Sequence, residues 1–181
     1  MGKLIALFSI LFLIGCADSY NIRVESGTTA TDNGLMNKEL KGETQRLIVG
    51  SATFFASWKN VDVGIGPSTS IPLTGDASGV GGQVWIRPRI SIYDLFDIYF
   101  VTCGGIDYYH SKWAPQGTYW GFPFQVGPGV RVPVPFFSGV SATLDYRLWH
   151  ESNGSRYFGN NNEPNPGFNC DVVMFGLEFK L

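Results

Sequence analysis

The strongest constraint in this sequence is a two-residue alternation of apolar and polar side chains. It is clearest at the end of the chain, where every odd position of Val173–Leu181 is apolar and the even positions include Gly176, Glu178 and Lys180. Successive side chains of a β-strand point to opposite faces of its sheet, so this segment predicts a strand with one apolar and one polar face. No stretch shows a convincing 3.6-residue period, and 23 Gly with 10 Pro also argue against a helical bundle.

Three upstream segments, 140–148, 122–134 and 80–92, alternate in the same way. Their apolar faces comprise Val140, Ala142, Leu144, Tyr146 and Leu148; Phe122, Phe124, Val126, Val130, Val132 and Val134; and Val80, Val84, Ile86, Ile90 and Ile92. The opposite faces carry charged residues in mid-strand, such as Arg131, Asp145 and Arg147. Prolines at 123, 128, 133 and 135 weaken the predicted strand around them, because proline has no N–H for the ladder.

The charged polar faces, together with aromatic residues near strand ends, favour a membrane β-barrel with an apolar outside and a polar lumen. At about 10 residues per strand, eight strands need about 80 residues, which the region 46–181 supplies. We therefore predict an all-β, eight-stranded antiparallel outer-membrane β-barrel over 46–181, located in the cell outer membrane. Its lumen is expected to hold side chains rather than a diffusion pore. A secreted β-sandwich or a lipocalin-like barrel is the alternative fold.

The composition fits a membrane-facing surface and weighs against polyanion binding. Charged residues make up 15% of the chain, against about 25% in an average soluble domain. The 13 basic and 15 acidic residues give a formal net charge of −2, so bulk charge provides no basic stripe for a nucleic acid. The expected partners are therefore a membrane and its lipids, with no nucleic acid.

The N-terminus carries an export signal. Lys3 precedes the apolar stretch Leu4–Ile14, which is shorter than the roughly 20 residues of a transmembrane helix and suits a signal peptide over residues 1–15. Leu13-Ile14-Gly15-Cys16 resembles a bacterial lipobox, in which Cys16 is lipidated, and ordinary cleavage nearby is the competing interpretation. Residues 16–45 are polar and are predicted to form an N-terminal linker before the barrel.

Cys103 and Cys170 are the other two cysteines. Export allows them to pair, but two cysteines do not make a disulfide framework and their spacing fits no metal site. We interpret them as small apolar residues in strands. His110 has no recognisable metal-binding partners, so neither a metal nor another cofactor is expected.

One pair of residues suggests chemistry. His150 and Ser152 are two apart at the end of the penultimate predicted strand, so they share its apolar, lipid-facing side. Polar groups on that side require an explanation. A serine hydroxyl beside a histidine that can take its proton is the minimum for acyl transfer through an acyl-enzyme. The alternative is that both residues lie just beyond the apolar belt, at a loop mouth.

The last predicted strand offers a third group on the same side. Asn169 and Asp171 share the parity of Val173. If the hairpin is symmetric about the loop 153–168, Ser152 faces Asn169 and His150 faces Asp171 across about 5 Å. A polar residue that orients the histidine is then within reach.

Residues 144–181 resemble the end of the PagL-type lipid A deacylases, also called acyloxyacyl hydrolases. The resemblance rests on His150-Glu151-Ser152-Asn153, a loop, Pro164-Asn165-Pro166-Gly167-Phe168-Asn169 and a terminal strand. It implies an eight-stranded outer-membrane barrel and a serine esterase. Its serine, activated by histidine, removes the 3-hydroxyacyl chain at position 3 of lipid A without a cofactor. The implied partner is lipid A or lipopolysaccharide in the outer leaflet.

The resemblance also implies roles for single residues. Ser152 is the nucleophile and His150 the general base, while Asn153 helps to form the oxyanion hole. On physical grounds, a backbone N–H of Gly154 is an equally reasonable oxyanion donor. The chain departs from the family at Asn169, where an acidic residue is usual. An asparagine can orient a histidine but does not stabilise its charged form as a carboxylate does, so impaired activity is one expectation. Asp171 and Glu163 are the alternative third members.

Two other functions fit the same sequence. One is a non-enzymatic small barrel that serves adhesion or envelope structure through its loops. The other is a secreted or lipid-anchored binding module. A homodimer is compatible with each of these interpretations.

Overall fold

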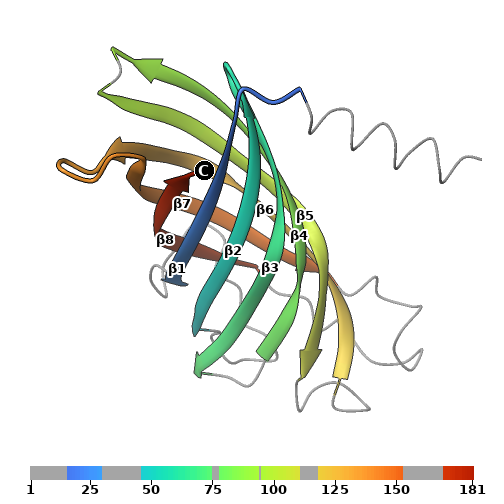
Figure 1. Cartoon of the computed structure of the whole chain (residues 1–181). Helices are drawn as coiled ribbons and strands as arrows, with labels where there is room; N and C mark the ends of the chain where they lie inside the picture. The colour runs from blue at the N-terminus through green and yellow to red at the C-terminus, as the bar shows by residue number, and fades with distance from the viewer. Residues whose placement is uncertain (1–15, 30–45, 75–77, 94, 111–117, 153–168) are drawn as a thin grey trace, which may run out of the picture.

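Eight antiparallel strands follow one another around a closed barrel, and the last strand pairs with the first (Figure 1). This computed structural model describes residues 16–29, 46–74, 78–93, 95–110, 118–152 and 169–181. The strands are β1 (Ser19–Thr29), β2 (Arg46–Trp58), β3 (Val61–Thr74), β4 (Ser78–Ile92), β5 (Phe96–His110), β6 (Thr118–Pro133), β7 (Val140–Ser152) and β8 (Asn169–Lys180). The predicted fold class is confirmed.

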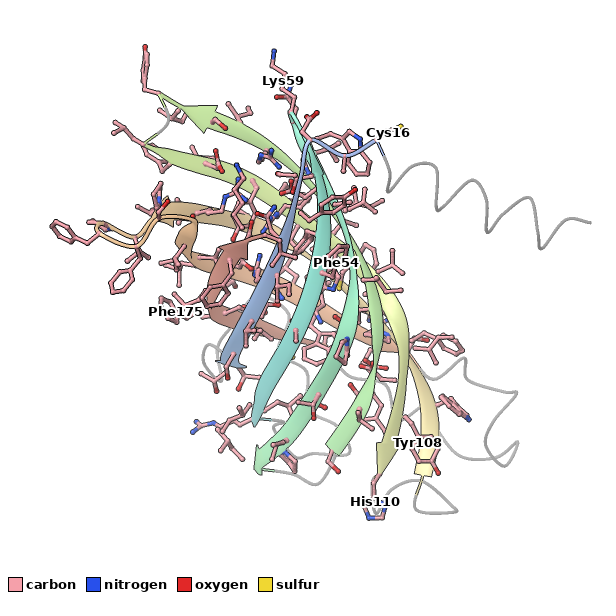
Figure 2. The ribbon with its side chains drawn as sticks, in the orientation of Figure 1. Cys16, Phe54, Lys59, Tyr108, His110 and Phe175 are labelled. Carbon is pink, nitrogen blue, oxygen red and sulfur yellow. The ribbon has the colours of Figure 1, made fainter. Side chains whose placement is uncertain are left out.

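The outer surface of the barrel is apolar, as the alternation predicts. On β8, Val173 and Phe175 are exposed while Met174 and Glu178 are buried. The same pattern places Ile90 and Ile65 on the outer surface, at 68% and 63% exposure. Phe54 and Phe175 are labelled examples of exposed apolar residues in Figure 2. An apolar outer surface around a closed barrel fits a protein that crosses a membrane with its strands.

Charged side chains fill the centre of the barrel and compensate one another. Arg87 donates to Glu178 at 2.7 and 3.0 Å and to Asp62 at 2.8 Å. Arg147 donates to Glu25 at 2.8 and 2.6 Å and also pairs with Asp145. Both guanidinium groups are 1% exposed. Buried charges of this kind must be paired, so the lumen holds a connected network of ion pairs.

Two apolar clusters share the lumen with this network. The first comprises Leu47, Val49, Tyr109, Trp149, Cys170, Val172 and Met174, and the second comprises Phe55, Trp85, Tyr99, Val101 and Cys103. Cys103 and Cys170 therefore lie in different clusters, and both are buried free thiols. Their interpretation as small apolar residues in strands is confirmed.

The start of the barrel corrects the predicted domain boundary. β1 lies within the stretch 16–45 predicted as a linker, and it pairs with both β2 and β8. The barrel therefore begins at Ser19 rather than at Arg46. The alternation in β1 is too short to be recognised, because only its first outward positions are apolar and the later ones, Ser26 and Thr28, are polar.

The prolines interrupt the ladder locally without ending β6. Between β6 and β7 the pairing passes from Val126↔Leu148 to Gly129↔Asp145, across Pro128. Between β5 and β6 it likewise passes over Pro123. Each proline lacks a donor, yet β6 runs on as a strand of 16 residues.

The two ends of the barrel differ. β2 and β3, β4 and β5, and β6 and β7 are each separated by a short stretch of sequence at the end that also holds Cys16 (Figure 2) and the chain's C-terminus (Figure 1). At the other end β1 precedes β2, β3 precedes β4, β5 precedes β6 and β7 precedes β8, and 16, 3, 7 and 16 residues of the sequence separate these pairs of strands. We call these the short-turn end and the long-loop end; Lys59 and His110 mark them in Figure 2. In outer-membrane barrels the short turns face the periplasm and the longer loops face outward.

Cys16 lies just before β1 and is exposed with a free thiol. The predicted signal peptide, residues 1–15, lies outside the described residues. Within the described part of the chain, no helix is long and apolar enough to cross a membrane.

Candidate active site

His150 and Ser152 lie on the outer face of β7, next to the long-loop end. The residues between and before them, Glu151 and Trp149, point into the lumen at 0% and 1% exposure. His150 is exposed and Ser152 partly exposed. The predicted face of both residues is confirmed, so two polar groups stand on the apolar outer wall.

The histidine contacts an amide on the neighbouring strand. His150 and Asn169 are directly opposite each other in the β7–β8 ladder, and His150 Nδ1 lies 2.6 Å from Asn169 Oδ1. The predicted pairing is wrong by two residues, because Ser152 was expected to face Asn169 and His150 to face Asp171. A shift of two residues leaves every side chain on its own face, so alternation could not distinguish these registers.

This contact favours one tautomer of the imidazole. With Asn169 Oδ1 facing the ring, the oxygen can only accept a hydrogen bond, so the tautomer that fits this arrangement carries its proton on Nδ1. In the neutral ring, Nε2 then carries the free lone pair. That tautomer is the one a general base uses when Nδ1 is held by an orienting residue. The structure thus brings Asn169 into contact with His150, in a register two residues from the expected one, and its orienting role stays a prediction.

Apolar side chains flank the two polar groups on the side of β6. Ser152 is opposite Phe122 and His150 is opposite Phe124. These phenylalanines are 38% and 47% exposed on the outer wall. The hydroxyl and the imidazole therefore stand beside an exposed aromatic surface.

The structure describes only one of the two alternatives to Asn169 as the third catalytic residue: Asp171 is described and Glu163 is not. Asp171 is opposite Leu148 rather than His150, and its carboxylate accepts a hydrogen bond from the Tyr146 hydroxyl. Asp171 is fully buried although it has the outward parity of β8. Asn153, Gly154 and Glu163 lie outside the described residues, so their roles remain predictions.

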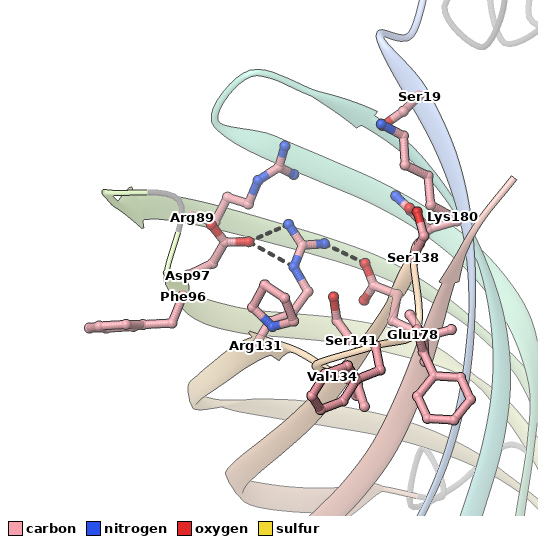
Figure 3. Close-up of a pocket in the computed structure, with 16 residues that line it drawn as sticks. Ser19, Arg89, Phe96, Asp97, Arg131, Val134, Ser138, Ser141, Glu178 and Lys180 are labelled. Atoms are coloured by element: carbon pink, nitrogen blue, oxygen red, sulfur yellow. Dashed lines mark hydrogen bonds and ion pairs between the residues drawn. The ribbon is translucent and has the colours of Figure 1, made fainter.

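A separate cavity opens at the short-turn end (Figure 3). It has a volume of about 710 Å³, and Arg89, Asp97, Arg131, Glu178 and Lys180 are among its lining residues. Arg131 donates to Asp97 at 2.7 Å and pairs with Glu178, so the charges at this mouth largely compensate one another. The cavity lies at the opposite end from His150 and takes no part in the candidate site. The sequence placed Arg131 and Glu178 on the inner face but did not indicate a cavity.

Among the described residues, no three His, Cys, Asp or Glu side chains come together as a possible metal site. His110 ends β5 at the long-loop end and is exposed.

Comparisons with known proteins support the architecture. No family model matches the sequence, and no curated protein matches it. Among solved structures, the crystal structure of Neisserial surface protein A (NspA) matches with a TM-score of 0.61 at 8% identity, covering 90% of this chain and 96% of that chain. At this identity the similarity concerns the fold alone. The chain is thus an eight-stranded barrel of the outer-membrane type, similar in architecture to NspA.

Proposed function

We propose that this protein is a serine esterase of the outer membrane that removes the 3-O-linked hydroxyacyl chain from lipid A. The observation that carries the proposal is the contact between His150 Nδ1 and Asn169 Oδ1, with Ser152 on the same outer face. The contact orients the proposed base on the apolar outer surface of the barrel. The resemblance of residues 144–181 to PagL-type deacylases supplies the reaction and the substrate.

In the proposed reaction, Ser152 Oγ attacks the ester carbonyl carbon while His150 Nε2 takes the hydroxyl proton. Backbone or side-chain donors of Asn153 and Gly154 stabilise the resulting oxyanion. When the intermediate collapses, the C–O bond of the ester breaks and His150 returns the proton to the departing sugar oxygen. Water then attacks the acyl-enzyme with His150 again as base, which releases the fatty acid and restores Ser152.

The location of the site agrees with the proposed substrate. Lipid A occupies the outer leaflet, and its ester bonds lie near the membrane interface. A site in the lumen could not reach them, whereas a site on the outer wall meets them laterally. The position of His150 and Ser152 next to the long-loop end supports the proposal, because the longer loops of outer-membrane barrels face outward, toward that leaflet.

The direct test is mass spectrometry of lipid A from cells that express either the wild-type protein or Ser152→Ala. We expect loss of one 3-hydroxyacyl chain with the wild type and unchanged lipid A with the variant. Heat modifiability on a gel, which reports a folded barrel, must be the same for both. If lipid A is unchanged with a correctly folded wild-type barrel, the esterase proposal is wrong and a non-enzymatic envelope barrel becomes the better interpretation.

A further inference from the structure

The outer wall holds a buried carboxylate next to the candidate site. Asp171 is 0% exposed and has the outward parity of β8, between Asn169 and the lipid-facing Val173. Its neighbour across the ladder is Leu148, an apolar residue of the outer face. Ionisable groups at membrane depth are costly to bury and are commonly kept for function. The position of Asp171 therefore requires an explanation beyond packing.

Tyr146 holds this carboxylate in place. Tyr146 lies on the outer face of β7, and its hydroxyl donates to Asp171 Oδ2. Tyr146 itself is opposite Val173, so its side chain reaches diagonally across the ladder to make this bond. A phenol that donates to a carboxylate fixes the carboxylate's position without neutralising its charge. Two strands thus cooperate to keep a carboxylate beside Asn169.

The spacing along β8 brings this charge close to the histidine. His150 is opposite Asn169, and Asp171 lies two residues further along β8 on the same face. Asp171 is therefore the diagonal neighbour of His150, about 7–8 Å away. Asn169 already contacts the imidazole through Oδ1. On a wall that borders lipid, the low dielectric lets opposite charges interact over such a distance more strongly than in water. The carboxylate is therefore close enough to stabilise a positive charge on His150.

We propose that Asp171, held by Tyr146, is a positioning residue that supplies the negative charge missing from Asn169. The inference rests on the proposed esterase function. Asn169 fixes the tautomer of His150, and Asp171 stabilises the imidazolium that forms when Ser152 gives up its proton. The carboxylate accepts no proton itself, so the chemical balance of the reaction is unchanged. The tasks of one acidic residue are thus divided between Asn169 and Asp171.

The first measurement compares kcat and KM of the full-length, lipid-reconstituted protein with those of Asp171→Asn, using lipid A as the substrate. We expect kcat to fall about 10- to 100-fold with little change in KM, because the charge acts only after proton transfer. Tyr146→Phe should lower kcat in the same direction but by less. Asp97→Asn makes the same chemical change at the short-turn end and should leave kcat unchanged.

The same substitution, Asp171→Asn, made in a second variant, Asn169→Asp, tests whether the loss of kcat comes from the missing charge or from a change in structure. In Asn169→Asp the carboxylate stands next to His150, so adding Asp171→Asn should lower kcat by less than about twofold. Equal losses in both backgrounds, or an unchanged kcat for Asp171→Asn in the wild-type background, would overturn the inference. If neither the wild type nor Asn169→Asp cleaves lipid A, the proposed function itself fails and the inference fails with it.

Discussion

Polar residues in this barrel occur in two settings, the lumen and the outer wall at the long-loop end. In the lumen, Arg87 and Arg147 are buried and each contacts two carboxylates. On the outer wall, His150 contacts Asn169 beside an exposed aromatic surface. The lumenal groups compensate one another's burial, which a folded barrel requires. The wall groups are the proposed base and its proposed orienting amide, and the fold does not require them. We therefore expect the first set to control stability and the second to control activity.

The largest expected effect is on activity. His150→Ala removes the base that would take the proton of Ser152, so lipid A deacylation should fall by at least about 10³-fold. Initial rates with purified, reconstituted protein measure the loss, and heat modifiability should match the wild type. An unchanged rate would show that the wall residues are not catalytic. The proposed division, with activity on the outer wall and stability in the lumen, would then be wrong.

The opposite response is expected from the lumen. Arg147→Ala leaves Glu25 and Asp145 buried without this partner, which should cost about 3–5 kcal/mol of unfolding free energy. Urea unfolding of the barrel folded in lipid vesicles measures the difference. The matched control is Lys180→Ala, which removes an exposed cation and should change the unfolding free energy by about 0.5 kcal/mol or less. Equal effects of the two variants would contradict a stabilising role for the lumenal network.

The apolar part of the wall provides a third test. Phe175 is 59% exposed near the middle of β8, so Phe175→Arg puts a cation against lipid. We expect a loss of about 2–4 kcal/mol in unfolding free energy, the cost of a basic residue at the bilayer midplane. Phe175→Leu keeps an apolar contact with lipid and should cost less. If both variants are equally stable in the same vesicle assay, the outer face near Phe175 is not embedded in lipid.

The sequence largely predicted which residues face the lumen and which face outward. Alternation placed Arg147, His150 and Ser152 on the correct faces, because parity along a strand needs no knowledge of its partner. The ion-pair partner Glu25 was missed, since β1 has too few apolar outward residues to be recognised as a strand. The sequence therefore did not predict the pairing of β1 with its neighbours, nor the ion pairs through which Glu25 compensates charge in the lumen.

The candidate site was predicted less completely than the fold. Its residue types and its face followed from the sequence, but the register of β7 and β8 did not, because a two-residue shift preserves both faces. That shift decides which side chain touches His150. The bond from Tyr146 to Asp171 depends on the same register and on a diagonal reach across strands, and no sequence pattern indicated it.

The smallest expected effect concerns Asn169, which occupies the position opposite His150 where an acidic residue would supply a carboxylate. Asn169→Asp puts a charge in direct contact with the imidazolium, and we expect kcat to rise about tenfold, equivalent to about 1.4 kcal/mol in the barrier. Asn169→Ala, which removes the orienting oxygen, should instead lower kcat. Both rates are measured on lipid A in vesicles, with heat modifiability as the control for folding. The rise should be modest because Asp171 already provides part of the charge in the wild type. A gain near 10³-fold would mean that His150 lacks charge support in the native wall, whereas no gain would mean that orientation alone is sufficient.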